Sequence, residues 1–484
     1  MPALYRRIDL TADVLRQLAY REPADFPVLL DSAAPGRLGR HSILAAYPLG
    51  ALWLDGLGRL HSDGLGALPA QSGFIPALQE LLQREARAQD GPSPSHTVPA
   101  GAAGPFQGGW MLFLSYEMAA EFEPQLDLPC AVSSSHIAGE APSALALRVA
   151  AAVSFDHASG ESWLIAEEGR GDLLERLEAR IRRLPSPADA LARLQSLPLP
   201  AVTLDEDPPE RYRWCVERAL DHIRAGDVYQ ANLARGWRGE WDETASEELT
   251  ARLYERLRRA NPAPFAALAQ HRGWALLSSS PERLLRSARR RVETRPIAGT
   301  RPRSRNPGAD SRELAALIAN PKERAEHVML VDLARNDLGR VCEGGSVQVE
   351  EMLGTESYAH VHHIVSSIVG RLRADVTPLH LLRAVFPGGT ITGCPKFRCM
   401  QIIAQLEGQA RGAYTGSIGY LNHDGSMDFN ILIRSFTLIG RHLELRAGAG
   451  IVADSQWERE LAETRAKARG LLAALETAPA ASVP

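Results

Sequence analysis

The sequence predicts a large α+β fold, in which antiparallel or mixed β-sheets lie at the centre and helices lie outside them. Two observations predict it. Residues 1–165 contain short apolar runs between Gly and Pro turns, such as GGWMLFLSYEM and ALALRVAAAVSF, which is the pattern of β-strands. Beyond residue 208, strand-like runs such as GWALLSSS and HLELRAGAGIVA alternate with strong helical patterns.

The chain has 484 residues, which is long for one ordinary domain, so we expect two domains or one large intertwined fold. The segment LPLPAVTLDEDPP at 197–209 is rich in proline and acid and is the best linker candidate. We therefore divide the sequence into an N-terminal region at 1–200, a C-terminal region at 208–475, and a small-residue tail at 476–484 that we expect to fray.

Charge and hydropathy exclude several classes of protein. The net charge of −4 provides no overall basic surface, which argues against extended nucleic-acid binding. No apolar run approaches the roughly 20 residues that span a bilayer, so we expect no membrane partner. The start, MPALYRRIDLTADVL, lacks the apolar core and cleavage site of a signal peptide, and we expect a cytoplasmic protein.

The segment RPIAGTRPR at 295–303 has the composition of a loop that binds a small anion. Gly299 allows the backbone to approach a ligand closely, and Thr300 offers an amide and a hydroxyl. Arg295, Arg301 and Arg303 can each bind a carboxylate in a forked geometry. This loop therefore predicts a site for a small polyanionic substrate.

Two predicted helices each carry a pair of glutamates on one face. The first begins at Asn320, an N-cap candidate, and places Glu323 and Glu326 three residues apart. The second is expected to begin at Ser455, with Glu458 at its capping-box position.

On this second helix Glu460, Glu463 and Lys467 share a face. Such pairs are common on solvated helix faces, which is the alternative interpretation. Each pair, however, follows a Gly-rich element, AGT or the GAG at 448–450. Four converging carboxylates would favour a hard cation such as Mg²⁺.

Three further features could belong to the same site. FPGGTITGCPKFRCM at 386–400 predicts a turn that leads into a helix, without the spacing of a nucleotide-binding loop. His362 and His363 lie on opposite faces of a predicted strand, and one of them could transfer a proton near neutral pH. Arg434 lies in the apolar run NILIRSF, predicted as a strand, and would need an anionic partner if it is buried.

Seven motifs recur in one order and resemble the chorismate-utilising enzymes, namely component I of anthranilate synthase and of aminodeoxychorismate synthase, and the isochorismate and salicylate synthases. The resemblance covers about residues 208–475 and implies a large fold of sheets packed as a sandwich. These motifs are SSSPER, PIAGTRPR, ERAEHVMLVDLARNDLGR, VHHIVS, GGTITGCPK, IRS and GAGIVADS.

The resemblance implies a role for each site residue. It implies an Mg²⁺ site in which Glu326 and Glu463 bind the ion directly, while Glu323 and Glu460 hold its water. It implies three catalytic residues near the ring hydroxyl of chorismate: Glu282, His363 and Lys467. Of these, Glu282 and His363 would transfer protons. It implies a chorismate-binding set made of Gly299, Thr300, Thr392, Tyr414, Arg434, Gly448 and Gly450.

The branch of the family depends on a few positions. Isochorismate and salicylate synthases have a water-activating lysine where this chain has Gln230, which favours ammonia as the nucleophile. Thr392, SYAHVHHIVSS and GSIGYLN followed by GIVADSQ resemble aminodeoxychorismate synthase, whose product is 4-amino-4-deoxychorismate for p-aminobenzoate and folate synthesis. We therefore predict that activity, with anthranilate synthase as the alternative.

Ala298 favours the alternative. The best-known aminodeoxychorismate synthases have a lysine nucleophile at this position, whereas alanine is the anthranilate synthase pattern. The family usually takes its ammonia from a separate glutamine amidotransferase subunit, and we expect the same partner here. The segment Leu30-Asp31-Ser32 resembles the part of anthranilate synthases that binds tryptophan. This pocket could be regulatory, structural or vestigial, or the segment could be a plain strand edge.

Overall fold

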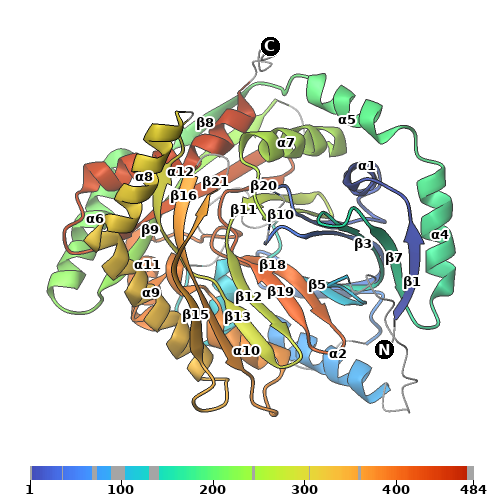
Figure 1. Cartoon of the computed structure of the whole chain (residues 1–484), viewed down its shortest axis with the longest axis horizontal. Coiled ribbons are helices and arrows are strands. Elements are labelled where there is room, and N and C mark those ends of the chain that lie inside the picture. Colours follow the sequence, from blue (N-terminus) through green and yellow to red (C-terminus); the bar gives the residue numbers. More distant parts are fainter. Residues whose placement is uncertain are drawn as a thin grey trace.

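The computed structural model describes residues 3–34, 36, 38–67, 73–88, 104–129, 141–242, 246–304, 306–357 and 361–476 (Figure 1). These residues form 12 α-helices and 21 strands, so the predicted α+β class is confirmed. The strands join into one hydrogen-bonded sheet whose described pairings between strands are all antiparallel. Of the predicted tail, only Glu476 lies within the described residues.

The strands of the N-terminal region are β1 (Ala3–Ile8), β2 (Val28–Asp31), β3 (His41–Leu54), β4 (Leu60–Asp63), β5 (Gly109–Leu114), β6 (Ala144–Asp156) and β7 (Ser162–Glu167). Those that follow are β8 (Val202–Glu206), β9 (Gln230–Trp241), β10 (Phe265–His271), β11 (Trp274–Ser280), β12 (Arg283–Ala288), β13 (Arg291–Thr294), β14 (Ile297–Pro302), β15 (Gln348–Ser357), β16 (Val361–Arg371), β17 (Gly393–Cys394), β18 (Ser417–Asn422), β19 (Met427–Asn430), β20 (Ser435–Ile439) and β21 (His442–Ile451).

The helices are α1 (Ala12–Arg21), α2 (Phe74–Ala88), α3 (Ala119–Phe122), α4 (Gly171–Arg182), α5 (Pro187–Ser196), α6 (Pro209–Arg224), α7 (Glu247–Ala260), α8 (Pro307–Ala319), α9 (Pro321–Gly339), α10 (Pro378–Val385), α11 (Lys396–Glu407) and α12 (Trp457–Leu475). Short 3₁₀ turns are η1 (Tyr116–Met118) and η3 (Gly389–Ile391). None of these helices is long and apolar enough to cross a membrane.

The two sequence regions share this sheet. Strand β2 pairs with β10, and β5 pairs with β18, so strands from before and after residue 200 are hydrogen-bonded neighbours. One path through the sheet runs β8-β9-β21-β20-β11-β10-β2-β3-β6-β5-β18-β19-β12-β13-β16. The boundary that we place at residues 200–208 of the sequence therefore does not divide the sheet.

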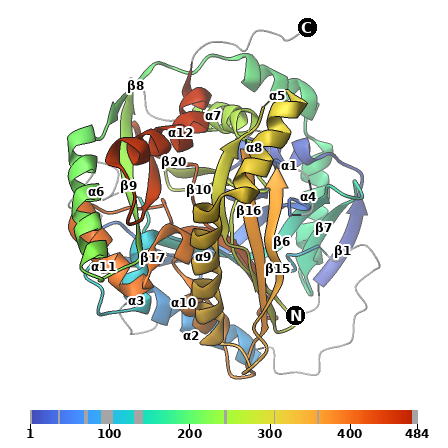
Figure 2. The same ribbon diagram turned by 60° about the vertical axis from the view of Figure 1, so that its left-hand side comes forward.

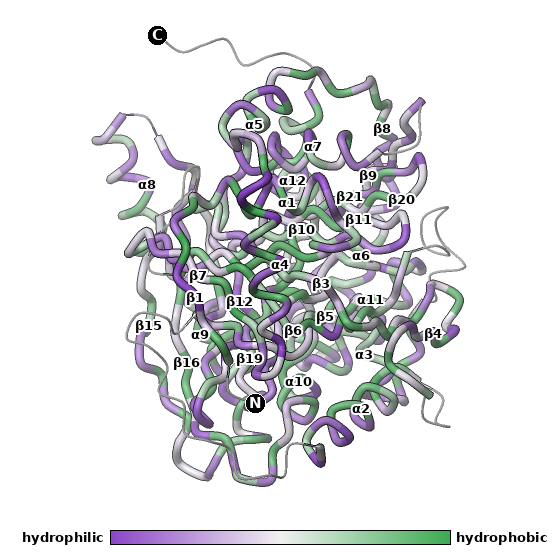
Figure 3. Tube along the Cα trace, turned by 90° about the vertical axis from the view of Figure 1, so that its right-hand side faces the viewer, coloured by the Kyte–Doolittle hydropathy of each residue, from purple (hydrophilic) through white to green (hydrophobic). Residues whose placement is uncertain are grey.

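The sheet folds back on itself as a sandwich with apolar residues between its layers. Met111 and Phe113 of β5, Leu276 of β11 and Ile418 of β18 belong to one buried cluster. The rings of Phe113 and Trp274 lie 4.9 Å apart between their centroids, which joins the two layers. Hydrophobic residues dominate central strands such as β3 and β6, as Figure 3 shows.

Helices cover both outer faces of the sandwich. Helices α1, α4, α7 and α12 bury apolar residues in one cluster, and α2, α3, α9 and α10 bury theirs in another. Their apolar residues recur at helical spacing, so each helix buries one face and solvates the other. Helix α9 runs beside β14 and β16, and Figure 2 shows it in the foreground next to β16. This contact places the predicted acidic helix next to the Ala-Gly-Thr strand.

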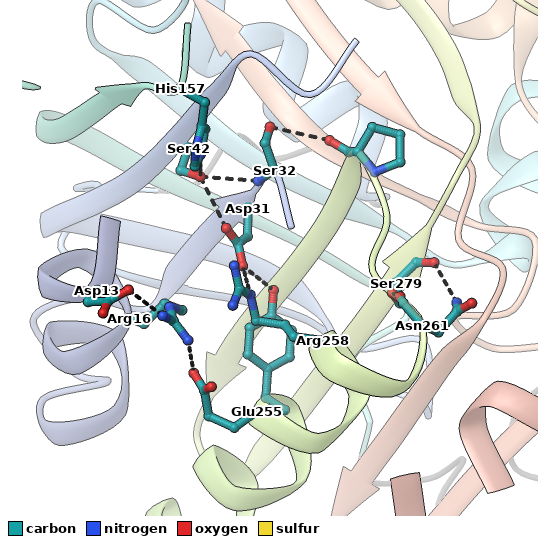
Figure 4. A network of polar contacts seen from close by, with 12 residues as sticks. Asp13, Arg16, Asp31, Ser32, Ser42, His157, Glu255, Arg258, Asn261 and Ser279 are labelled. Atoms are coloured by element: carbon teal, nitrogen blue, oxygen red, sulfur yellow. Dashed lines mark hydrogen bonds and ion pairs between the residues drawn. The ribbon is translucent and has the colours of Figure 1, made fainter. Parts of the chain in front are cut away.

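A buried polar network ties α1 to α7, as Figure 4 shows. The Glu255 carboxylate, 1% exposed, accepts hydrogen bonds from Arg16, from the hydroxyl of Tyr20 at 2.7 Å and from Gln195 at 3.0 Å. Arg16 also pairs with Asp13. Since Arg16 is itself buried, its charge depends on these partners.

We expect Glu255→Gln to lower the free energy of unfolding by about 3 kcal/mol, because it leaves the buried Arg16 without its main counter-charge. Urea denaturation followed by circular dichroism would measure the change. The matched control is Glu248→Gln, on the exposed face of the same helix, where the ion pair with Arg252 spans 3.8 Å and its loss should cost about 0.5 kcal/mol or less. Equal effects of both substitutions would contradict the prediction.

Candidate active site

Gly299 has a backbone conformation that favours glycine, and it lies so close to Glu323 that a side chain would not fit easily. Its φ of +65° lies in the left-handed region, and the register of β14 against β16 shifts between Ala298 and Thr300. A Cβ at this position would lie 2.9 Å from Oε2 of Glu323. Thr300 is paired with His363 across the strands, while its side chain lies outside the described residues. The predicted close approach therefore brings this loop against the acidic helix.

The expected substrate contacts of two loop arginines are not confirmed. Arg295 is buried and donates to Glu351 at 3.1 Å and Glu356 at 2.8 Å. Arg303 donates to Asp310 at 2.9 Å. These protein carboxylates already occupy the forked guanidinium groups, so both residues order the loop. Nη2 of Arg301 lies 3.9 Å from Oε1 of Glu323, a looser pair.

Glu282, between β11 and β12, is a buried carboxyl with a displaced pKa. Its side chain is 4% exposed, and the hydroxyl of Thr390 donates to Oε1 at 2.8 Å. Burial raises the pKa of Glu282 to about 7, because the lost hydration outweighs this hydrogen bond and the nearby charges of Arg434 and Lys467. Glu282 can therefore exist as a proton donor or as a base near neutral pH. Thr390 belongs to the GGT motif, but the sequence analysis did not predict its contact with Glu282.

His363 of β16 lies beside the same loop. Its Nδ1 is 3.2 Å from the carbonyl oxygen of Gly299, so Nδ1–H donates and Nε2 is the basic nitrogen. Burial lowers the pKa of His363 to about 4, and the charges of Arg434 and Lys467 act in the same direction. His362 points the other way, toward Ser357 and Asp310, as the predicted alternation requires. His360 lies outside the described residues.

Lys467 and Tyr414 meet at Gly448. Lys467 Nζ donates to the carbonyl oxygen of Gly448 at 3.0 Å and lies 2.6 Å from Oε1 of Glu463. A Cβ on Gly448 would lie 2.7 Å from the hydroxyl of Tyr414. A Cβ on Gly450 would lie 2.5 Å from Nε2 of Gln230. At Gly448 a Cβ would also lie 2.7 Å from the backbone oxygen of Leu233, which cannot shift easily, whereas at Gly450 only the Gln230 side chain would have to move.

Arg434 is not in a strand, contrary to the prediction. Strand β19 ends at Asn430 and β20 begins at Ser435, and Arg434 between them has a φ of +56°. Burial lowers the pKa of Arg434, while Tyr414, Glu282 and Glu463 are the nearby groups that stabilise its charge. Apolar neighbours on both sides concealed this break in the sequence. The carboxylates that act on Arg434 are Glu282 and Glu463, and a direct anionic partner stays a prediction.

The hydroxyl of Thr392 is bonded within the protein, and its expected substrate contact stays a prediction. The residue is fully buried, and its hydroxyl donates to the carbonyl oxygen of Gly388 at 3.0 Å. It therefore stabilises the turn at η3 that presents Thr390 to Glu282. Lys396 of the same motif pairs with Asp337 at 2.6 Å, which also makes it a structural residue.

The helix that carries Glu460 and Glu463 begins later than predicted. Helix α12 starts at Trp457, and the hydroxyl of Ser455 accepts from the amide of Val452. Ser455 closes the preceding turn and does not cap the helix. The first helix, by contrast, begins after Asn320 as predicted.

The metal-ligand set has suitable chemistry but is not gathered in the described structure. Glu323 and Glu326 share the partly buried face of α9, and oxygen-only donors suit a hard cation. Within the described ranges, however, no group of three or more His, Cys, Asp or Glu side chains is placed to hold a metal ion. Glu463 instead pairs with Lys467. The ligand set stays a prediction.

Leu30, Asp31 and Ser32 line a cavity of about 680 Å³ between β2, β10 and β12. The Asp31 carboxylate accepts from Arg258 at 2.5 Å and from Ser42 at 3.1 Å (Figure 4). Burial alone would raise the pKa of Asp31, but Arg258 and Arg16 outweigh it and hold that pKa low. This charged group is therefore already neutralised by the protein.

The sequence and the fold of this chain match known proteins. The family model for chorismate binding enzyme matches residues 67–473, so the chain belongs to that family of chorismate-utilising enzymes. Anthranilate synthase component 1 of Thermus thermophilus is 37% identical over 98% of this chain and 97% of its own.

Two other similar proteins represent both ammonia-using branches that the sequence suggested. Aminodeoxychorismate synthase component 1 of Bacillus subtilis is 38% identical over 77% of each chain. The crystal structure of anthranilate synthase component I from Streptococcus pneumoniae superposes with a TM-score of 0.75 at 31% identity, covering 96% of this chain and 99% of that chain.

Proposed function

We propose that the chain aminates chorismate with ammonia, as component I of a two-subunit amidotransferase. The observation that carries the proposal is the buried Glu282 carboxyl, with a pKa of about 7, beside the cations Arg434 and Lys467. Such a group can protonate a leaving hydroxyl while neighbouring cations hold the substrate carboxylates.

In this proposal each residue has a defined task. Arg434, Lys467, Tyr414 and the backbone at Gly299, Thr300, Gly448 and Gly450 bind and orient chorismate. Glu282 gives its proton to the ring hydroxyl, which leaves as water when its C–O bond breaks and a C–N bond forms. Neutral His363 accepts at Nε2 the proton that the new C–NH3+ group loses, since its pKa of about 4 leaves it unprotonated at neutral pH. For anthranilate, the ring proton on the aminated carbon is then lost while the ring C–O bond to the enolpyruvyl group breaks, and this group leaves as pyruvate.

We propose Mg²⁺ as the cofactor, held by Glu326 and Glu463 with Glu323 and Glu460 around it. When bound, the cation would neutralise a substrate carboxylate and favour departure of the hydroxyl.

Anthranilate is the product that the site residues favour. Ala298 lies in β14 directly before Gly299 and offers no amine to the ring. Two of the features that suggested 4-amino-4-deoxychorismate make contacts within the fold: Thr392 is bonded within a turn, and β18 pairs with β5 in the sandwich. Tyr358, Ala359 and His360 of SYAH lie outside the described residues. Aminodeoxychorismate synthase remains the second candidate, supported by the Bacillus subtilis relative.

A product assay tests this choice. Purified chain is incubated with chorismate, Mg²⁺ and ammonium, and anthranilate fluorescence is followed without any added lyase. We expect fluorescent anthranilate and pyruvate in equal amounts. An amine product that becomes p-aminobenzoate only after addition of a lyase would contradict the first candidate and support the second. Failure to consume chorismate would contradict both.

We also propose that a separate glutaminase subunit supplies the ammonia and that the 680 Å³ cavity binds tryptophan. Leu30 and Ser32 line this cavity, which supports the resemblance to a tryptophan-binding segment. We expect tryptophan to lower turnover, and Ser32→Phe, which fills the cavity, to remove that response. Isothermal titration with tryptophan would check it, with Ser196→Phe on exposed α5 as the control. Heat exchange that persists in Ser32→Phe would contradict the proposed location.

A further inference from the structure

A small cavity of about 30 Å³ lies beside Glu282, between β12, α9 and the turn at η3. The carboxyl groups of Glu282 and of Asp337 on α9 both line it, together with Thr294 and Thr390, and its other walls are mostly apolar. A buried water molecule needs about 10–15 Å³ and roughly two to four polar partners. The cavity therefore has room for about two water molecules beside the two carboxyl groups.

Asp337 lies nearer to solvent than Glu282 does. The side chains of Asp337 and Lys396 are each 13% exposed, whereas Glu282 is 4% exposed. Nζ of Lys396 donates to Oδ2 of Asp337 at 2.6 Å and to the carbonyl oxygen of Val385 at 3.1 Å, which fixes the position of the Asp337 carboxylate. The cavity and Asp337 thus form a polar connection from the enclosed Glu282 toward the surface.

Glu282 needs such a connection, because it gives up its proton in every turnover of the proposed reaction. Bound chorismate would cover the little exposure that the residue has, so protons from solvent would reach it slowly from that side. Burial raises the pKa of Asp337, although Lys396 and Arg340 act against it. A buried carboxyl of this kind takes up a proton near neutral pH more readily than an exposed aspartate does, which suits it to proton transfer.

We propose that Asp337 and water in this cavity return to Glu282 the proton that it gives to the ring hydroxyl. The proposal rests on the amination proposed above and adds the source of the proton for the next turnover. The O–H bond of protonated Asp337 breaks and its proton passes to the cavity water, while this water gives one of its own protons to the Glu282 carboxylate. Asp337 then takes a proton from solvent. Lys396 holds Asp337 in place and does not carry the proton.

Asp337→Asn tests this proton relay, because an amide keeps the size of the side chain and an acceptor for Lys396 but carries no acidic proton. The full chain is mixed at pH 7 with excess chorismate, Mg²⁺ and ammonium, and the amine product per chain is counted by rapid quench. Glu282, with a pKa of about 7, starts protonated in about half of the chains. We expect a burst of about half a product per chain at the unaltered rate, and later turnovers slowed about tenfold.

A second variant tests the water in the cavity and leaves both carboxyl groups in place. Ala334 of α9 lines the same cavity, and Ala334→Val adds two methyl groups that would fill it. We expect the same burst and the same slow later turnovers as in Asp337→Asn, whereas the unaltered chain should show no burst. An Ala334→Val variant that folds and turns over without a burst would overturn the role of the water.

The matched control is Lys396→Met, which removes the same ion pair and keeps the Asp337 carboxyl. It should lose stability to urea as Asp337→Asn does, yet show no burst. The solvent deuterium isotope effect on kcat should rise in Asp337→Asn and not in Lys396→Met, since return of the proton limits turnover only in the first.

Two results would overturn the relay. Bursts of equal size in Asp337→Asn and Lys396→Met would mean that Asp337 acts only through its ion pair. An Asp337→Asn variant with an unchanged kcat, or with a first turnover as slow as the later ones, would mean that Asp337 does not return the proton. Unaltered chain that binds chorismate but forms no amine product would instead overturn the proposed function itself, before any variant is made.

Discussion

Glu282→Gln should lower kcat by about 10²- to 10⁴-fold while chorismate still binds, because the substitution removes a proton donor and keeps the volume of the side chain. The amide can still accept the hydrogen bond from Thr390 that orients Glu282. Stopped-flow turnover and a separate chorismate titration would measure the two effects. A variant that keeps more than about a tenth of kcat would contradict the assignment.

The pH profile gives a second measure of the same residue. Burial raises the pKa of Glu282 to about 7, so the donor form predominates below pH 7 and falls tenfold for each pH unit above it. We expect kcat to fall with rising pH through about 7, and this limb to disappear in Glu282→Gln. His363, with a pKa of about 4, is already neutral and adds no limb in this range.

A matched control distinguishes Glu282 from other buried carboxyls. Burial also raises the pKa of Glu117, whose oxygens accept the backbone amides of Arg411 and Gly412. Glu117→Gln should leave the alkaline limb in place. If Glu117→Gln also lost this fall of kcat with rising pH, the fall would reflect a change in the fold and not the ionisation of Glu282.

Glu326→Ala should reduce Mg²⁺-dependent turnover by about 10²-fold or more, since the proposed ion would lose a direct ligand. Turnover is measured against Mg²⁺ concentration in both proteins. The control is Asp332→Ala, an exposed carboxylate on the same helix that pairs only locally with Arg335 at 3.0 Å and should change nothing. If turnover of Glu326→Ala depends on Mg²⁺ as it does in the unaltered protein, Glu326 is not a direct ligand of the ion.

Sequence reasoning succeeded where a residue type is demanded locally. Gly299 was identified because glycine allows a close backbone approach, and the structure gives it a φ of +65°; Asn320 was identified because an N-cap has a distinctive side chain. The opposite faces of His362 and His363 followed from strand periodicity alone.

The misjudged residues depend on partners that are remote in the sequence. Arg295 was assigned to substrate, yet Glu351 and Glu356 neutralise it from β15, which lies more than 50 residues away. Oε1 of Gln230 and Oδ1 of Asn232 have no hydrogen-bond donor among the described residues. A sequence cannot show this, because it depends on all the residues that surround each oxygen in the fold.

The pairing of β5 with β18 has a consequence for synthesis of the chain. Strand β18 follows β5 by about 300 residues, and at roughly 5–20 residues per second the ribosome needs about 15–60 s to make that length. Until β18 has been made, one edge of β5 has no partner strand. An unpaired apolar strand edge can form hydrogen bonds with a strand of another chain and so lead to aggregation. The nascent N-terminal region should therefore depend on chaperones more than its stable final packing suggests.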